Sequence, residues 1–371
     1  MEAAGISHVR TSARWQLAAR RAGTHSLLIW PPLALVWVIA VSLHTHVLAF
    51  DFGHAYLPAA RAILDGRSPY PPASVAALTP RTAFVYPPLT AYLAAPFTVL
   101  SNGTAEILVT ALCVAGVLAI PWLLGVRDWR CYAIMFLWVP VYSAIQIANV
   151  TLLLAVGLAL IWRFRERAAA VAILAGLLIA LKLFVWPLLL WLLATRRSRA
   201  AVWGAVAGVT LIVLPWAAIG FAGLWQYPHL TQVLNQVEGT DTYTIAALLS
   251  GVVPFTVAEV AAAGAGLAVL TASSRFGLRD ERASFALMIG AMLLLSPIVA
   301  MSYFVFLVIV LCLFTPRFGW QWAAPLLLWA GPQFGNGATW QTAAVLAVAA
   351  GILTVAVRAG TGSGPASRHA G

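Results

Sequence analysis

Asp51 is the residue of this 371-residue chain whose type and position best suit acid–base chemistry. It follows an apolar run that ends at Phe50, so a carboxyl group is held at the end of a rigid segment. His54 lies three residues further on, one turn away if the segment is helical. The carboxylate is either a catalytic base or a solvated acid that caps a helix at His54–Leu64, and position alone favours the cap.

Lys182 is the second candidate, because it interrupts the apolar stretch 178–185 at the tip between two apolar segments. An ionisable residue in such a place is either functional or a lysine that extends to the lipid headgroups, and the two interpretations weigh equally. Gln146 and Asn149 occupy the corresponding tip of the preceding pair of segments. They could bind a hydroxylated ligand, although a role in tying helices together is favoured.

Motifs for metals and nucleotides are missing from the sequence. No second acid lies within three residues of Asp51, and neither a GxGxxG pattern nor a P-loop is present. Cys113, Cys131 and Cys312 show no spacing typical of a metal site or a disulfide. We therefore expect no metal and no cofactor.

The composition indicates the elements that must hold these residues. Apolar residues make up 62% of the chain and charged residues only 9%, against about 25% in a soluble domain. The apolar segments are long and do not alternate every second residue, which excludes a membrane β-barrel. The sequence predicts an all-α polytopic membrane protein.

The net charge of +11 does not indicate nucleic-acid binding, because the basic residues lie in short clusters between apolar runs. This is the pattern of cytoplasmic loops. The clusters are Arg20-Arg21, Arg163/Arg165/Arg167, Arg196-Arg197/Arg199 and Arg275/Arg279/Arg282.

About twelve membrane-spanning segments satisfy this charge rule. The expected spans are 27–49, 104–125, 131–147, 149–162, 168–181, 183–195, 200–220, 253–273, 283–299, 302–315, 320–332 and 340–357. Residues 87–100 are apolar but short, and a re-entrant or interfacial helix is preferred there over a further span. The predicted organisation is a cytoplasmic segment 1–26, one transmembrane domain 27–358 and a disordered cytoplasmic tail 359–371.

Two polar segments, 50–86 and 221–243, are longer than a turn requires, and both are predicted on the outer face. Long loops in a compact bundle are usually functional. Asp51, His54, Asn149 and Lys182 all fall on this predicted outer side.

The order of these features resembles glycosyltransferase family 87, which uses polyprenyl-phosphate sugars and includes mannosyltransferases and arabinofuranosyltransferases. The resemblance covers most of the chain and depends on the order of its motifs. These are Asp51; Tyr56, Arg61, Gly66, Pro69 and Tyr70; Phe84 to Leu89 leading to Pro96; Gln146 with Asn149 to Leu153; Ala175 to Leu177 leading to Lys182; Arg196-Arg197; and Ser296 to Ile298.

The resemblance implies a C-type glycosyltransferase (GT-C) fold, with juxtamembrane helices in the outer loop after the first span. It implies that Asp51 is the general base for an inverting transfer, and that Lys182 lies near the donor phosphate. Arg61 is a weaker candidate for the same phosphate. The remaining expected substrate-binding residues are His54, Tyr86, Asn149, Gln146 and Tyr303.

One position departs from the family pattern. Relatives commonly carry a histidine after the Ser-Pro motif, where this chain has Met301-Ser302-Tyr303. Tyr303 can donate a hydrogen bond but carries no positive charge. His54 and His229 are both available to take that role.

Taken with the membrane topology, the resemblance implies a plasma-membrane hexosyltransferase with an extracytoplasmic active site. Mannose on a polyprenyl phosphate is the expected donor, and a glycolipid or glycan is the acceptor. The alternatives are an arabinofuranosyltransferase of the same fold and, from another class, a twelve-span transporter or lipid flippase. Related halves or helices broken at the midplane would indicate a transporter, and the sequence shows neither.

Overall fold

The computed structural model describes residues 25–361, with side chains as far as Arg358. Over that range the chain consists of helices and loops and contains no strand, which confirms the predicted all-α class. The predicted segment 1–26 lies almost wholly outside the described residues. The same holds for the predicted tail 359–371, except that α17 (Thr339–Thr361) includes its first three residues.

Within the described residues, five helices are long and apolar enough to cross a membrane. They are His25–His44, α5 (Asn102–Leu123), α11 (Ser198–Ala218), α14 (Phe255–Phe276) and residues Thr339–Arg358 of α17. At about 1.5 Å per residue each reaches roughly 30 Å, the thickness of the hydrocarbon layer. A sixth candidate is the pair α6 (Trp129–Met135) and α7 (Val139–Ile147), which is bent by 67°. The protein is therefore a helical membrane protein.

The other apolar helices are shorter than a bilayer crossing. They are α8 (Val150–Arg163), α9 (Ala168–Leu181), η3 with α10 (Leu183–Val185, Pro187–Ala194), α15 (Glu281–Leu295) and η5 with α16 (Met301–Phe306, Leu307–Phe314). A 14-residue helix such as α8 is about 21 Å long. The count of about twelve crossings consequently stays a prediction.

The structure bears on two segments whose form the sequence left to be tested. Residues 320–332, expected to form a short span, fold as two 3₁₀ helices, η6 (Trp320–Trp322) and η7 (Ala324–Ala330). Residues 87–100 form α4 (Leu89–Ala94) and η2 (Ala95–Val99). This piece is too short to cross the hydrocarbon layer as one helix, which favours the re-entrant or interfacial alternative.

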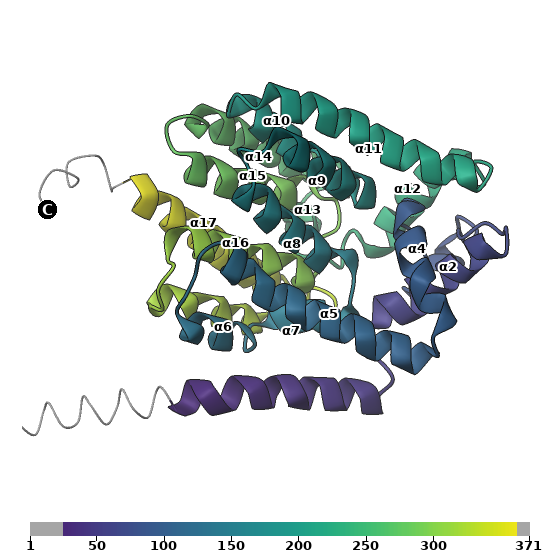
Figure 1. The fold of residues 1–371 in the computed structure, drawn as a ribbon, viewed down its shortest axis with the longest axis horizontal. Coiled ribbons are helices and arrows are strands. Elements are labelled where there is room, and N and C mark those ends of the chain that lie inside the picture. Colours follow the sequence, from purple (N-terminus) through teal and green to yellow (C-terminus); the bar gives the residue numbers. More distant parts are fainter. Residues whose placement is uncertain (1–24, 362–371) are drawn as a thin grey trace, which may run out of the picture.

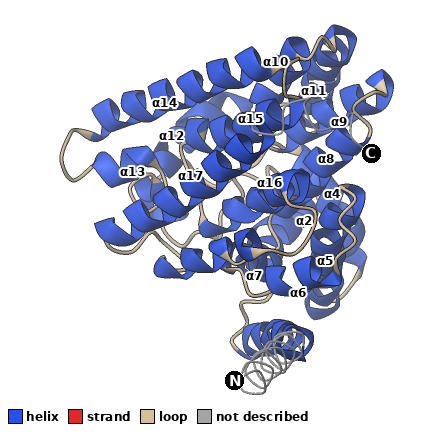
Figure 2. Cartoon of the chain, turned by 90° about the vertical axis from the view of Figure 1, so that its left-hand side faces the viewer, coloured by secondary structure: helices blue, strands red, loops and turns tan. Residues whose placement is uncertain are grey.

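Of the short helices, α8, α15 and α16 lie in the interior of the bundle (Figure 1). Every residue of α16 from Leu307 to Leu313 is buried, as expected for a helix that is apolar on all sides. The helix His25–His44, in contrast, lies at the edge of the bundle in both views (Figures 1 and 2). Its exposed apolar side chains, which include Trp30 and Trp37, suit a lipid environment.

Small residues bring α9 and α11 close together. A Cβ atom placed on Gly176 would lie 2.5 Å from the Cβ atom of Ala207 and 2.7 Å from the backbone nitrogen of Gly208. Close backbone approach through small residues is a usual way to pack helices in lipid, where apolar contact alone favours no partner. This contact positions the end of α9, and so the residue that follows it, Lys182.

The two polar segments fold into short helices and pack against each other. The first contains η1 (Phe52–Tyr56), α2 (Leu57–Leu64) and α3 (Val75–Leu78), and the second contains η4 (Leu224–Gln226) and α12 (Tyr227–Glu238), before α13 (Ile245–Leu249). Leu78 is buried with Leu230 and Val233 of α12. An ion pair of 2.5 Å between Arg81 and Asp241 adds a polar link between the segments. The expected long loops are thus ordered and form one cover over the helix ends.

Candidate active site

A cavity of about 610 Å³ lies where this cover meets the ends of α7, α8 and α9. Its size falls in the range of small-molecule sites, about 300–1,000 Å³. The polar and ionisable residues that line it are Asp51, Arg81, Tyr86, Ser143, Asn149, Lys182, Tyr227, Thr231, Asn235, Glu238, Asp241, Thr242, Ser296, Tyr303 and Gln333. Five of the eight predicted site residues line this cavity, and three do not.

Asp51 is placed at the cavity by a break in the helical backbone. Ala49 has φ 50°, a left-handed conformation, and lies in the turn directly before Phe50. The helical path then restarts at Phe50 and passes into the π-helical turn η1 directly after Asp51. π-helical turns are frequent at functional sites. The Asp51 side chain makes no cap hydrogen bond to η1, so the capping role that position favoured is not formed.

Burial raises the pKa of the Asp51 carboxyl to about 6, against the ordinary value of 3.8. The charge of Lys182 and a hydrogen bond from Asn149 act in the opposite direction. Desolvation has the larger effect because a carboxylate loses its water on entering a largely apolar cavity. The group therefore changes charge near neutral pH.

Asn149 reaches Asp51 from the start of α8. Its side-chain oxygen accepts the backbone N–H of Thr151 over 2.9 Å and so caps the helix. This leaves the amide NH₂ as the group that donates to the Asp51 carboxylate. Ala148 makes the turn between α7 and α8 with φ 48°, which aims the two helix ends at one point.

Lys182 lies in extended conformation between α9 and η3, with φ −156°. Its ammonium group donates to the Tyr303 hydroxyl. It also lies over three aromatic rings, 4.2 Å from the centroid of Tyr303, 5.3 Å from Tyr86 and 5.6 Å from Phe184. Burial lowers the pKa of Lys182 to about 8, while Asp51 raises it. The ammonium group is thus held by aromatic faces, which suit a cation that has lost most of its water.

Tyr56 connects Tyr86 to the helix ends. The two rings meet edge to face with centroids 5.0 Å apart, and their hydroxyls are hydrogen-bonded. The Tyr56 hydroxyl also accepts the backbone N–H of Val150 over 3.3 Å. Tyr56 entered the sequence analysis only as a residue of the family motif, and the structure gives it a positioning role.

Three predicted site residues do not line the cavity, and their side chains contact other residues. His54 stacks on Phe50 with ring centroids 4.5 Å apart. It lies outside the cavity, although its charge still lowers the pKa of Asp51. Arg61 donates to Asn102 over 2.6 Å. The Gln146 side chain accepts a hydrogen bond from Gln333, which lines the cavity, and donates one to Ser42 over 2.8 Å. Gln146 therefore lies behind the residues that line the cavity.

Glu238 is a cavity residue that sequence reasoning did not select. It ends α12, and burial raises the pKa of its carboxyl while Arg81 and Lys182 lower it. The sequence did contain a pattern that could have indicated it. Glu238 is an acid in a polar segment, and the apolar residues of that segment follow a helical spacing that places Leu230 and Val233 on one face. That pattern predicts a helix with a buried face, but it does not predict which part of the protein the face packs against.

No metal-binding cluster is formed by the part of the chain that the structure describes. Residues 25–361 contain no group of three or more His, Cys, Asp or Glu side chains close enough to hold an ion. The three cysteines are all free, with Cys131 and Cys312 buried.

Comparison with known proteins identifies the family of this chain. No curated protein and no solved structure matches the chain. The model of glycosyltransferase family 87 matches residues 84–297, which include Tyr86, Asn149, Lys182 and Glu238. Because that match covers more than half of the sequence, the chain belongs to glycosyltransferase family 87.

Proposed function

We propose that this membrane glycosyltransferase moves a hexose, with mannose the expected sugar, from a polyprenyl-phosphate donor to a hydroxyl group of a glycolipid or glycan. The observation that carries the proposal is the shared cavity of Asp51 and Lys182, a carboxyl and an ammonium group among mostly apolar walls. Each interacts electrostatically with the other, and each has its pKa moved toward neutrality by burial. Such pairs are a feature of acid–base sites.

The transfer requires one proton acceptor and one stabilised leaving group. The acceptor hydroxyl oxygen forms a bond to the anomeric carbon as the bond from that carbon to the phosphate oxygen breaks. The hydroxyl proton passes to the Asp51 carboxylate, and the electron pair of the broken bond leaves with polyprenyl phosphate. Attack opposite the leaving phosphate inverts the anomeric configuration.

The electrostatics of the cavity suit both partners of this step. A general base works best when its pKa lies near the working pH, and that of Asp51 is about 6. Negative charge grows on the phosphate as it leaves, and the Lys182 ammonium group can offset that charge in a poorly hydrated site. Tyr303, hydrogen-bonded to Lys182, can donate to the same phosphate in place of the histidine common in relatives.

Glu238 lines the same cavity from the cover, and its carboxylate can accept hydrogen bonds from sugar hydroxyls. The ion pair of Arg81 with Asp241 holds the neighbouring part of the cover in place. Reaction chemistry is thus assigned to Asp51 and Lys182, and sugar recognition to Glu238 at the end of α12. Family membership supports an enzyme over the transporter alternative.

The distribution of charge supports an extracytoplasmic site in the plasma membrane. Helix α8 runs from Asn149 at the cavity to Arg163, and α9 runs from Arg167 back to Lys182. The arginine-rich loops therefore gather at the end of the bundle opposite the cavity. Since arginines favour the cytoplasmic side, we place the cavity on the outer side.

The test uses purified protein in lipid with polyprenyl-phosphate mannose, arabinose and glucose as donors. Asp51→Asn should reduce transfer by at least about 10³-fold while the variant still inserts and folds, since the amide cannot accept the proton. Asp65→Asn is the matched control, because Asp65 is an exposed acid of the same segment that pairs with Arg67 at 2.8 Å. Normal transfer by Asp51→Asn would refute the assignment of the base, and preference for arabinose would replace mannose as the sugar.

A further inference from the structure

A second pocket, of about 280 Å³, lies at the ends of α5 and α8 that are remote from the cavity. It is lined by Trp122, Leu123, Leu124, Gly125, Arg127, Trp162, Arg163 and Arg165. The ionisable groups in this set are three arginines, and no acid within residues 25–361 lines the pocket. The pocket is therefore suited to an anion.

The nearby acids pair with arginines other than Arg127 and Arg163. Asp128, next to Arg127 in the chain, pairs with Arg130 at 2.7 Å and accepts the backbone N–H of Phe318 over 3.1 Å. Across the described residues, no carboxylate forms an ion pair with Arg127 or Arg163. Two exposed guanidinium groups thus face the pocket with no acid to balance them.

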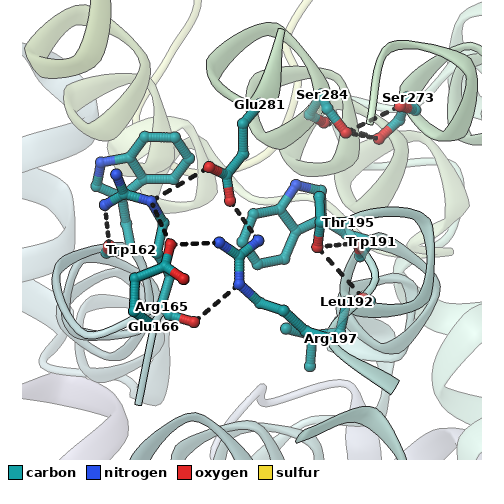
Figure 3. Close-up of polar contacts among 10 residues, drawn as sticks. All are labelled: Trp162, Arg165, Glu166, Trp191, Leu192, Thr195, Arg197, Ser273, Glu281 and Ser284. Atoms are coloured by element: carbon teal, nitrogen blue, oxygen red, sulfur yellow. Dashed lines mark hydrogen bonds and ion pairs between the residues drawn. The ribbon is translucent and has the colours of Figure 1, made fainter. Parts of the chain in front are cut away.

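Figure 3 shows how the third arginine is held. Glu281 forms ion pairs with Arg165, at 3.3 Å, and with Arg197. The Arg197 guanidinium forms a further ion pair with Glu166 at 2.6 Å. The Arg165 guanidinium lies 4.6 Å from the ring centroid of Trp162 and donates to the backbone carbonyl of that residue. The network fixes Arg165 at the pocket edge and leaves Arg127 and Arg163 for a ligand.

The place of the pocket in the bundle indicates where the anion comes from. Helix α5 has 22 residues and so separates the pocket from its own cavity-side end by about 33 Å, one bilayer thickness. Trp122 is 59% exposed at this level, where tryptophan favours the lipid headgroups. The outer flank of α5 continues from the pocket as apolar exposed surface, with Leu112 at 55% and Leu118 at 37%.

We propose that this pocket binds the phosphate group of an anionic phospholipid in the leaflet opposite the cavity. The guanidinium groups of Arg127 and Arg163 contact the phosphate oxygens, and the acyl chains lie along Leu118 and Leu112. Free phosphate offers the same anion without the chains, and the apolar flank is what favours the lipid. The bound lipid ties the end of α5 to the end of α8.

The experiment measures thermal stability of purified full-length protein in a neutral detergent during titration with phosphatidylglycerol. Phosphatidylcholine and inorganic phosphate are titrated in parallel. We expect phosphatidylglycerol to raise Tm saturably, and the other two to give little shift at equal concentration. Arg127→Gln with Arg163→Gln should weaken the apparent affinity by roughly 30-fold, about fivefold for each interfacial arginine.

The double variant Arg199→Gln with Arg279→Gln is the matched control, because it removes two exposed arginines from the same end of the bundle but outside the pocket. It should keep the full phosphatidylglycerol response. An equal loss in both double variants would overturn the proposal, since the lipid would then respond to net surface charge alone. A saturable response to inorganic phosphate that phosphatidylglycerol does not exceed would assign the pocket to a free anion and overturn the lipid assignment.

Discussion

Replacement of Lys182 by methionine should change both the rate of transfer and the pH at which the enzyme works. In the proposed mechanism the active form has Asp51 ionised and Lys182 protonated, with pKa values of about 6 and about 8. The wild-type rate should therefore peak near pH 7 and fall about tenfold by pH 5 and by pH 9.

Lys182→Met has two separable effects. The ammonium charge lowers the pKa of Asp51, so its removal raises that pKa above about 6 and moves the acid limb of the profile to higher pH. The basic limb near pH 8 disappears, because it belongs to Lys182 itself.

The loss of rate follows from the electrostatics of the leaving phosphate. Two unit charges about 4 Å apart interact by about 4 kcal/mol at an effective dielectric constant of 20, and preorganised donors contribute about 10²–10³-fold to kcat. The aromatic rings, whose centroids lie 4.2–5.6 Å from the Lys182 nitrogen, exclude water and so strengthen the electrostatic effect of the ammonium group on the phosphate. We therefore expect kcat to fall by about 10²–10³-fold at pH 7.

The assay is transfer of labelled sugar by protein in lipid, measured from pH 5 to pH 9 with saturating donor. Lys182→Arg keeps a charge that does not titrate, so it should lose the basic limb but retain more activity than the methionine variant. If Lys182→Met retained the basic limb, or lost less than about tenfold in kcat, the placement of the donor phosphate beside this ammonium group would be wrong.

Three further changes test the supporting residues. Asn149→Ala removes both the cap of α8 and the hydrogen bond to Asp51, so it should cost about 1 kcal/mol in unfolding measurements and shift the acid limb to higher pH. Glu238→Gln should raise KM for a sugar substrate by about tenfold in steady-state kinetics, while kcat changes by less than about threefold. Gly176→Leu places a side chain where even a Cβ would lie 2.5 Å from α11, so it should lower Tm through a cost of about 1–3 kcal/mol or more. Gly264→Leu is its control, since nothing lies within 4 Å of that position, and an equal loss of Tm there would contradict the packing argument.

The helical class and several residues of the cavity were predictable because they depend on local pattern. Continuous apolar segments predict helices, and polar residues at their tips predict helix ends that face one way. Asn149 and Lys182 were selected on that basis, and both line the cavity. Asp51 was selected by its place after the first apolar run, although position alone favoured a capping role that its side chain does not perform.

The number of crossings could not be obtained in the same way. Hydropathy measures how apolar a segment is, and the interior helix α16 is as apolar as one that faces lipid. Residues 320–332 have the composition of a span but fold as 3₁₀ turns against α7 and α17. A helix buried inside the bundle and a helix that faces lipid have the same apolar composition. Only the helix length separates the two cases, and the length is known only once the helix ends are known.

Side-chain partners distant in the chain explain the remaining differences. Arg61 was a phosphate candidate by motif, yet Asn102 holds its guanidinium. Gln146 is held by Ser42 and Gln333. Glu238 reaches the cavity because α12 packs its apolar face on Leu78. Each of these contacts joins residues far apart in sequence, and no spacing rule connects them.

The lengths of the helices give a physical reason for the position of the cavity. Helices α5 and α8 both end at the arginine pocket, but α5 has 22 residues and α8 has 14. At about 1.5 Å per residue, α8 stops about 12 Å short of the other end of α5. Helix ends leave backbone groups unpaired and bring polar side chains together, which the middle of a helix cannot do. The short helices therefore leave a recess below the level of the far end of α5, lined by Asn149 and Lys182 and closed by the cover. In the proposed function, the lipid-linked sugar enters this recess from the side, with its phosphate at the headgroup level and its polyprenyl chain in the bilayer.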